Sequence, residues 1–163
     1  GCTFVQCFLF GVFFHFHDAL PKGEQYVKTE IPGSISTKNM YTTVDKKEEL
    51  EALGGYLTQN HLTEKKVLLY GEIPAISYIF DMEPAVYTTW ADLRSNTLER
   101  LQADLDAITT DYPVVIVTDA IGQELSGNTS YVDEKLDAIA QFLSRGNYQC
   151  GYAQKGYYVY TSQ

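Results

Sequence analysis

Two short, wholly apolar runs constrain this chain more than any other feature of its sequence. Residues 67–70 read Val-Leu-Leu-Tyr, and residues 114–117 read Val-Val-Ile-Val. Apolar runs of this length, β-branched throughout in the second case, are typical of strands that are buried on both faces. Such strands need helices on either side of their sheet, so the two runs predict an α/β domain.

The stretch at 66–90 gives the clearest local order of elements. Gly71 breaks the strand at 67–70, and Pro74 suits the first turn of a helix, where its missing N–H costs nothing. A second short strand is expected at residues 85–89. Strand-to-helix turns are where α/β domains usually bind ligands, so this stretch also marks a candidate site.

Three amphipathic helices are predicted from apolar residues that recur at spacings of three and four. They are expected at residues 45–60, 97–110 and 131–144. The expected N-cap residues are Thr43 for the first helix, Ser95 or Asn96 for the second and Ser130 for the third. The remaining expected elements are a strand at 26–31, a polar loop at 122–130 and a closing hairpin at 148–152 and 156–161.

This order of elements alternates strands with helices along the chain. Such alternation predicts a mainly parallel sheet with crossover helices, here in three layers with a C-terminal β-hairpin. The topology would be Rossmann-like without a dinucleotide motif. The length of 163 residues and the lack of an internal linker predict one domain over residues 1–163.

Charge and cysteine content exclude some classes of function. A net charge of −9 repels phosphate backbones, so nucleic-acid binding is not expected. The three cysteines, Cys2, Cys7 and Cys150, form no CxxC pair and have no metal-binding spacing. Cys2 and Cys7 lie in an apolar segment and are expected as packed thiols, with one bridge to Cys150 as an alternative.

The N-terminal segment at 2–16 is rich in phenylalanine. It is shorter than a membrane-spanning helix and lacks the basic start of a signal peptide. Two interpretations remain open: a buried strand, or the outer end of a membrane helix in a longer parent protein. The nearby His15, His17 and Asp18 suggest a metal site, because the two histidines could converge on one face of a strand. No third ligand is indicated, so a polar strand end is expected.

Polar residues follow the predicted parallel strands and should meet at one edge of the sheet. They are Gly71, Glu72, Thr88, Thr89, Trp90, Thr118 and Asp119. A carboxylate pair of Glu72 and Asp119 beside Trp90 suits a sugar, because carboxylates accept hydroxyl hydrogen bonds and an indole stacks on the ring. The same pair also suits acid–base chemistry. A purely structural role is the third possibility: Glu72 at a helix start, Asp119 at a turn and Trp90 at the edge of the core.

Motifs for cofactors and catalysis are not found. The sequence Tyr-Gly-Glu-Ile-Pro-Ala lacks the glycines of a dinucleotide loop, and there is neither a P-loop nor a GxSxG elbow. No spacing supports a catalytic triad. We therefore expect no cofactor and no metal, and we assign no catalytic residue.

Several segments together resemble a known type of protein. They are Phe-His-Phe-His-Asp, Asn-Met-Tyr-Thr-Thr, Leu-Leu-Tyr-Gly-Glu-Ile-Pro-Ala-Ile-Ser-Tyr-Ile-Phe-Asp-Met-Glu-Pro-Ala and Thr-Thr-Trp-Ala-Asp-Leu. In this order they resemble the C-terminal soluble region of polytopic bacterial membrane proteins described as glycosyltransferases that use lipid-linked sugars. The resemblance implies an accessory extracytoplasmic domain, whose partners are the membrane portion of its parent chain and a glycan or lipid-linked sugar. The catalytic acid of such enzymes lies in membrane loops outside this chain.

Three hypotheses follow. In the first, the domain belongs to a membrane-anchored glycosyltransferase and holds an acceptor glycan or packs against the membrane part, with contacts from Glu72, Trp90, Asp92 and Asp119. The second is a stand-alone small-molecule enzyme that uses Glu72 and Asp119. The third is a structural domain whose tyrosine-rich faces bind a partner protein. A deep pocket joining the site residues would favour the first two, and a flat apolar patch the third.

Overall fold

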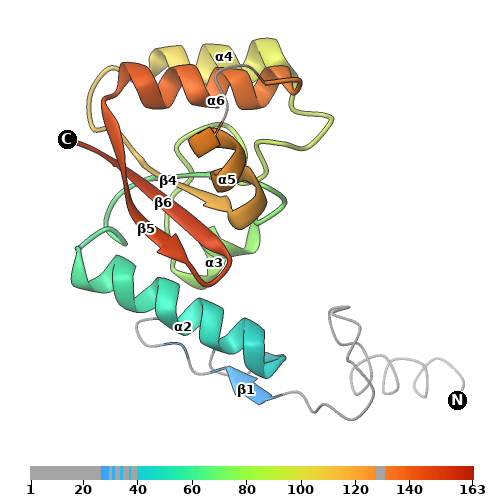
Figure 1. Ribbon diagram of the computed structural model, residues 1–163, viewed down its shortest axis with the longest axis vertical. Helices are drawn as coiled ribbons and strands as arrows, with labels where there is room; N and C mark the ends of the chain where they lie inside the picture. The colour runs from blue at the N-terminus through green and yellow to red at the C-terminus, as the bar shows by residue number, and fades with distance from the viewer. Residues whose placement is uncertain (1–26, 30, 32–33, 35–36, 38–39, 128–130) are drawn as a thin grey trace, which may run out of the picture.

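A computed structural model describes residues 27–29, 31, 34, 37, 40–127 and 131–163 (Figure 1). The elements in chain order are β1 (Val27–Thr29), β2 (Met40–Thr42), α2 (Val44–Gln59), β3 (Val67–Tyr70), α3 (Ala75–Ile79), α4 (Leu98–Ala107), β4 (Val114–Thr118), α5 (Asp119–Gly127), α6 (Glu134–Arg145), β5 (Tyr148–Gln154) and β6 (Tyr157–Ser162). The predictions for the segment at 2–16, for His15, His17 and Asp18, and for Cys2 and Cys7 lie outside the described residues.

Four strands form one mixed sheet in the order β3, β4, β6, β5, and β1 pairs with β2 in a separate ribbon. The α/β class and the C-terminal hairpin agree with the sequence predictions. The mainly parallel sheet does not: β3 and β4 are parallel, but β6 is antiparallel to both β4 and β5. β5 therefore runs in the direction of β4, as a crossover through α6 requires, and β6 lies between them.

The strand predicted at 85–89 is not formed. Pro84 makes a single parallel bridge with Val67, where the Val67 N–H donates to the Glu83 carbonyl at 2.8 Å and the Ala85 N–H to the Val67 carbonyl at 2.8 Å. Two residues later the Tyr87 N–H donates to the Asp104 carboxylate at 2.9 Å instead of to β3. The chain therefore follows the edge of β3 as an irregular loop.

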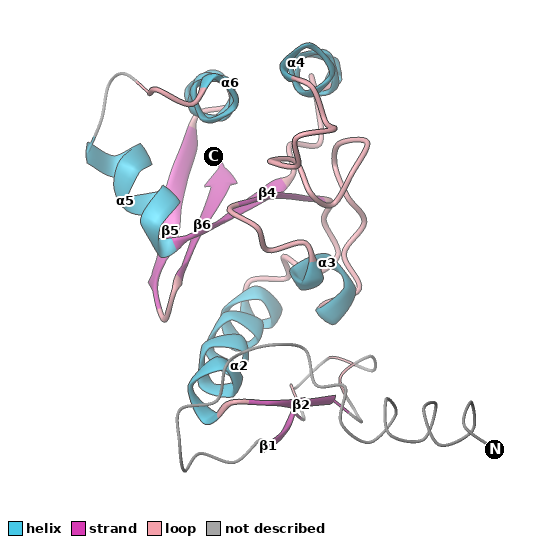
Figure 2. Ribbon diagram, turned by 90° about the vertical axis from the view of Figure 1, so that its right-hand side faces the viewer, coloured by secondary structure: helices cyan, strands magenta, loops and turns pink. Residues whose placement is uncertain are grey.

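Alternate residues of the two central strands face opposite sides of the sheet, as strand geometry requires. Val67, Leu69, Val114 and Ile116 join one apolar cluster with α2 and α3, and Leu68, Tyr70, Val115 and Val117 join a second with α4 and α6. All eight are 0–3% exposed. In Figure 2, α4 and α6 lie side by side above the sheet, and α2 lies on the opposite side. The predicted burial of both strands on both faces is confirmed.

The helices begin at capping side chains, as helices with unsatisfied N-terminal N–H groups require. Thr43 caps α2 by accepting from the Lys46 N–H, as predicted. α4 is capped by Thr97, not by Ser95 or Asn96. Asp133 caps α6, so this helix begins later than predicted, and Ser130 is outside the described residues.

Helix α5 replaces much of the polar loop predicted at 122–130. Gly122 suggested a loop but lies within this helix. It packs so closely on Tyr158 that a side chain at position 122 would collide with the Tyr158 ring. The Ser126 hydroxyl donates to the Gly122 carbonyl at 2.7 Å, a bond typical of helix interiors. The glycine therefore permits close packing of a helix on a strand, which local sequence cannot distinguish from a turn.

Two further findings bear on the predictions. In the described part of the chain, no helix is long and apolar enough to cross a membrane. Cys150 lies exposed on β5 as a free thiol, so the alternative of a bridge to Cys150 is not realised. Burial raises the pKa of this thiol, which makes it a weaker nucleophile at neutral pH.

Candidate functional site

The turn after β3 has an unusual backbone. Gly71 has φ +107°, and a Cβ at this position would lie 2.5 Å from the Thr118 Oγ1, so only glycine fits between the ends of β3 and β4. Glu72 follows with φ +60°, a left-handed conformation that costs a non-glycine residue about 1 kcal/mol. The Glu72 N–H donates to the Asp92 carboxylate at 2.7 Å, which helps to hold this conformation.

The loop at 84–97 is fixed by side chains that bind its backbone. The Asp104 carboxylate accepts from the Tyr87 N–H at 2.9 Å. The Asn96 amide donates to the Ala91 carbonyl at 2.9 Å, and the Lys135 ammonium donates to the Leu93 carbonyl at 2.8 Å. α4 and α6 each hold one side of this loop, so it is an ordered platform between them and the end of β3.

Two aromatic residues project from this platform. Trp90 is 38% exposed, and its backbone N–H donates to the Thr88 hydroxyl at 3.1 Å, with the partly buried Thr89 between them. Tyr87 is 71% exposed, and the Arg100 guanidinium lies 3.5 Å from its ring centre. Val86, Ala91 and Asn96 are the buried residues of the loop, whereas Trp90 keeps part of its surface open to solvent.

Tyr70, the last residue of β3, was missed as a polar member of this edge. It is only 2% exposed, and its hydroxyl donates to the Asp133 carboxylate at 2.7 Å. Burial, this hydrogen bond and the charges of Asp133, Asp92 and Glu124 raise the pKa of Tyr70. In sequence it belongs to an apolar run, so no local signal marks its hydroxyl as a link between β3 and the start of α6.

Asp119 has different partners from Glu72. It begins α5, its N–H donates to the Gly156 carbonyl at 2.9 Å, and its carboxylate accepts from the Gln123 amide at 2.6 Å. The structure thus brings Glu72, which follows Gly71, into contact with Asp92. Trp90 and Thr89 are on the same loop as Asp92, but Asp119 is bound to the β5–β6 turn and to its own helix.

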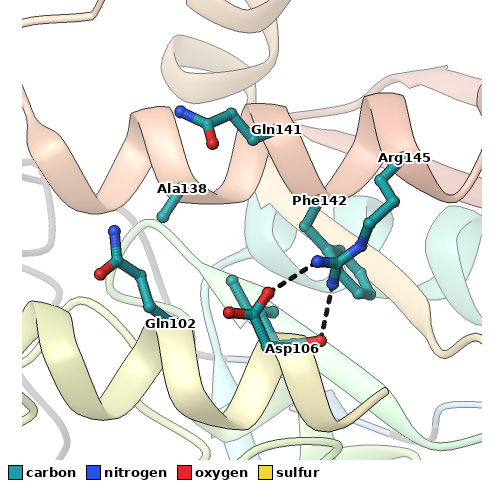
Figure 3. Close-up of a pocket in the computed structure, with 7 residues that line it drawn as sticks. Gln102, Asp106, Ala138, Gln141, Phe142 and Arg145 are labelled. Carbon is teal, nitrogen blue, oxygen red and sulfur yellow. Dashed lines mark hydrogen bonds and ion pairs between the residues drawn. The ribbon is translucent and has the colours of Figure 1, made fainter. Parts of the chain in front are cut away.

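Two hollows on the surface of the described residues lie away from these residues. One of about 450 Å³ lies between α4 and α6 (Figure 3), lined by Gln102, Leu105, Asp106, Ala138, Gln141, Phe142 and Arg145. Another, of about 260 Å³, lies at the opposite end of β3 and is lined by Lys66, Ala85, Ala107, Ile108, Thr110, Asp111 and Pro113. Neither is lined by a predicted site residue. The groove between α4 and α6 was missed because its residues come from two helices that are distant in sequence.

The carboxylates at the end of β3 do not form a metal centre. Across the described residues, no group of three or more His, Cys, Asp or Glu side chains could hold a metal ion. The arrangement offers carboxylate acceptors and a partly exposed indole on a fixed loop, which suits a ligand that is neutral and donates hydrogen bonds. Comparison of the sequence and fold with known proteins found no matching family model, no matching curated protein and no matching solved structure.

Proposed function

We propose that this chain is an accessory binding domain that holds a glycan on the loop at 84–97, within a membrane-anchored glycosyltransferase-like protein. The domain would lie on the extracytoplasmic side and leave catalysis to the membrane portion of its parent. Its fold would be a reduced three-layer, Rossmann-like arrangement in which the parallel unit is β3–β4. The resemblance of residues 66–93 to such proteins motivates this context.

The observation that carries the proposal is the fixed presentation of Trp90. Sugar rings stack on indole faces, and sugar hydroxyls donate to carboxylates. Trp90 is partly exposed two residues before Asp92, whose carboxylate also fixes the backbone of Glu72. Because Asp104, Asn96 and Lys135 already hold the loop, little conformational entropy is lost on binding.

The charges around the loop restrict the class of ligand that it can bind. Asp92, Asp133 and Glu124 all act on the Tyr70 hydroxyl, so this end of the sheet is acidic. Three cations lie on or beside the loop. The Lys135 ammonium donates to the carbonyls of Leu93 and Ala91 and the Arg100 guanidinium lies over the Tyr87 ring, so two of the three are already engaged, and Arg94 is exposed. A neutral glycan is therefore favoured over a phosphate-bearing one, and a lipid-linked sugar would present its sugar instead of its phosphate.

Trp90 also provides the test, because it is the only tryptophan of the 163-residue chain and its fluorescence reports on this loop alone. The chain is titrated with neutral oligosaccharides and with a lipid-phosphate sugar, with thermal shift as a second readout. We expect saturable quenching of Trp90 and a Tm increase that is smaller in Trp90→Ala.

The matched control is Tyr41→Ala, which removes another exposed aromatic ring from a different part of the molecule, the β1–β2 ribbon. This variant should bind as the natural chain does. A sugar that stabilises the chain without quenching Trp90 would contradict the proposed location. A chain that binds no sugar but associates with a protein partner through the same loop would instead favour the structural hypothesis.

A further inference from the structure

The groove between α4 and α6 has a closed apolar floor and polar walls. Leu105, Phe142 and Ala138 form the floor and are 3%, 2% and 8% exposed. They offer little surface for an apolar ligand to cover. The walls are side chains from the solvent-facing sides of the two helices, and Figure 3 shows Gln102 of α4 extending toward Ala138 of α6. The small side chain of Ala138 leaves room above the floor.

Hydrogen-bonding capacity remains on both walls. In the part of the chain that the structure describes, the Gln102 amide makes no hydrogen bond, so it offers two donors and an acceptor. The Gln141 amide nitrogen donates to Asp137 at 2.8 Å, which leaves the Gln141 carbonyl oxygen as an acceptor. At the far end, the Arg145 guanidinium donates to Asp106 at 2.6 Å and to the Leu105 carbonyl at 2.8 Å.

The charges of the groove argue against an anionic ligand, and its closed floor argues against a peptide helix. The positive charge of Arg145 is balanced by Asp106, and Asp137 adds a negative charge beside Gln141, so an anion gains little. A docked peptide helix needs pockets for apolar anchors, which the closed floor does not supply. A neutral ligand with many hydroxyl groups can use the amides, the carboxylate and the guanidinium together.

The groove also leads to the loop at 84–97. Lys135, in the first turn of α6, donates to the Leu93 carbonyl, whereas Arg145, at the end of α6, meets Asp106 at the end of α4. The two helices therefore run in the same direction away from the loop. A ligand in the groove would lie between them, with one end directed toward Leu93 and Trp90.

We propose that the groove between α4 and α6 is a binding site for a neutral, hydroxyl-rich ligand, such as a segment of an oligosaccharide. Its volume of about 450 Å³ lies within the range of small-molecule sites. The ligand class rests on the proposed function, but the location does not, because the groove shares no residue with the loop.

The test follows the side-chain amide signals of Gln102 and Gln141 by NMR in the full chain during titration with maltotriose, cellotriose and chitotriose. Glucuronic acid and inorganic phosphate are the charged comparators. We expect at least one trisaccharide to shift both amides in a saturable way. Gln102→Leu should weaken that binding about tenfold through loss of its hydrogen bonds. Ala138→Leu should abolish it by filling the groove.

Matched controls are Gln149→Leu and Ala153→Leu, which make the same changes at exposed positions of β5. If Ala138→Leu does not fold, Gln102→Leu on the exposed face of α4 decides the question. The site is disproved if no trisaccharide shifts the amides, if phosphate shifts them more strongly, or if the two β5 variants weaken binding equally.

The Trp90→Ala variant separates this proposal from the function proposed for the loop. Amide shifts of Gln102 and Gln141 that persist in Trp90→Ala support the groove as a separate site. The loop site is contradicted if the same trisaccharide causes no saturable quenching of Trp90 in the natural chain. Shifts confined to the loop at 84–97, with Gln102 and Gln141 unmoved, contradict the groove and leave the loop site supported.

Discussion

The helices on the two faces of the sheet are attached to it by different kinds of contact. On one face α2 packs Leu50, Leu53 and Leu57 against the strands beside the short helix α3, and apolar burial accounts for most of the attachment. On the other face α4 and α6 add hydrogen bonds with defined partners, such as Tyr70 to Asp133 and Arg145 to Leu105. Apolar contact is enough to attach a helix to a sheet, but hydrogen bonds with defined partners are needed to fix the conformation of a loop. The candidate site therefore lies on the side that has both.

The largest effect is expected from the apolar face. Leu53 is 0% exposed, and Leu53→Ala removes its contacts and leaves a cavity, at a cost of about 3 kcal/mol in the free energy of unfolding. Urea unfolding followed by circular dichroism measures this cost. A loss below about 1 kcal/mol would mean that α2 is not a principal support of the sheet.

Gly71→Ala should cost about 2 kcal/mol, because the new Cβ would both occupy a left-handed position and press on Thr118 Oγ1. The double variant with Thr118→Ala should recover part of the loss by removing the hydroxyl. Thermal unfolding of the single and double variants provides the comparison. Equal stability of the two would show that steric contact with Thr118 does not limit this turn.

Tyr70→Phe should cost about 1 kcal/mol at neutral pH, through loss of the hydrogen bond to Asp133. The pH dependence has a definite sign. The folded pKa of Tyr70 is raised above its ordinary value of 10.0, so the unfolded state loses its proton first and stability falls as the pH rises above that value.

Tyr70→Phe should therefore make the alkaline loss of stability less steep than in the natural chain. Urea unfolding between pH 8 and 11 checks this, with Tyr41→Phe at an exposed position as the control. An unchanged slope in Tyr70→Phe would mean that its hydroxyl is not protected in the folded state.

Glu72→Gly should act in the opposite direction and stabilise the chain by somewhat less than about 1 kcal/mol, since glycine accepts positive φ without strain. If Glu72 contacts the glycan, the same change should weaken sugar binding. Asp111→Gly, at another non-glycine residue with positive φ, should give the stability gain without the binding loss. A destabilised Glu72→Gly would mean that the turn is not strained.

Sequence patterns were sufficient where one physical signal dominated. The strands β3 and β4 were predicted because burial on both faces leaves a wholly apolar run, and α2, α4 and α6 because an apolar stripe recurs with the helical period. The place of β6 between β4 and β5 was not predicted, because strand pairing between distant segments leaves no local pattern.

The candidate site was predicted only in part for the same reason. Strand ends located Gly71 and Glu72, and the next loop supplied Trp90 and Asp92. The hydrogen bond between Glu72 and Asp92 joins residues 20 positions apart, and that between Tyr70 and Asp133 joins residues 63 apart. Such bonds depend on the assembled fold, as does the groove formed by Gln102 and Ala138.

The position of β6 has a consequence for biosynthesis. While the ribosome is still making residues 148–156, β4 has β3 on one side but lacks its neighbour on the other, so it presents an open edge of backbone donors and acceptors. β5 pairs only with β6, so it joins the sheet only when residues 157–162 connect it to β4. Until then the nascent chain is exposed to edge-to-edge association, and a chaperone that shields β4 would have its greatest effect during that interval.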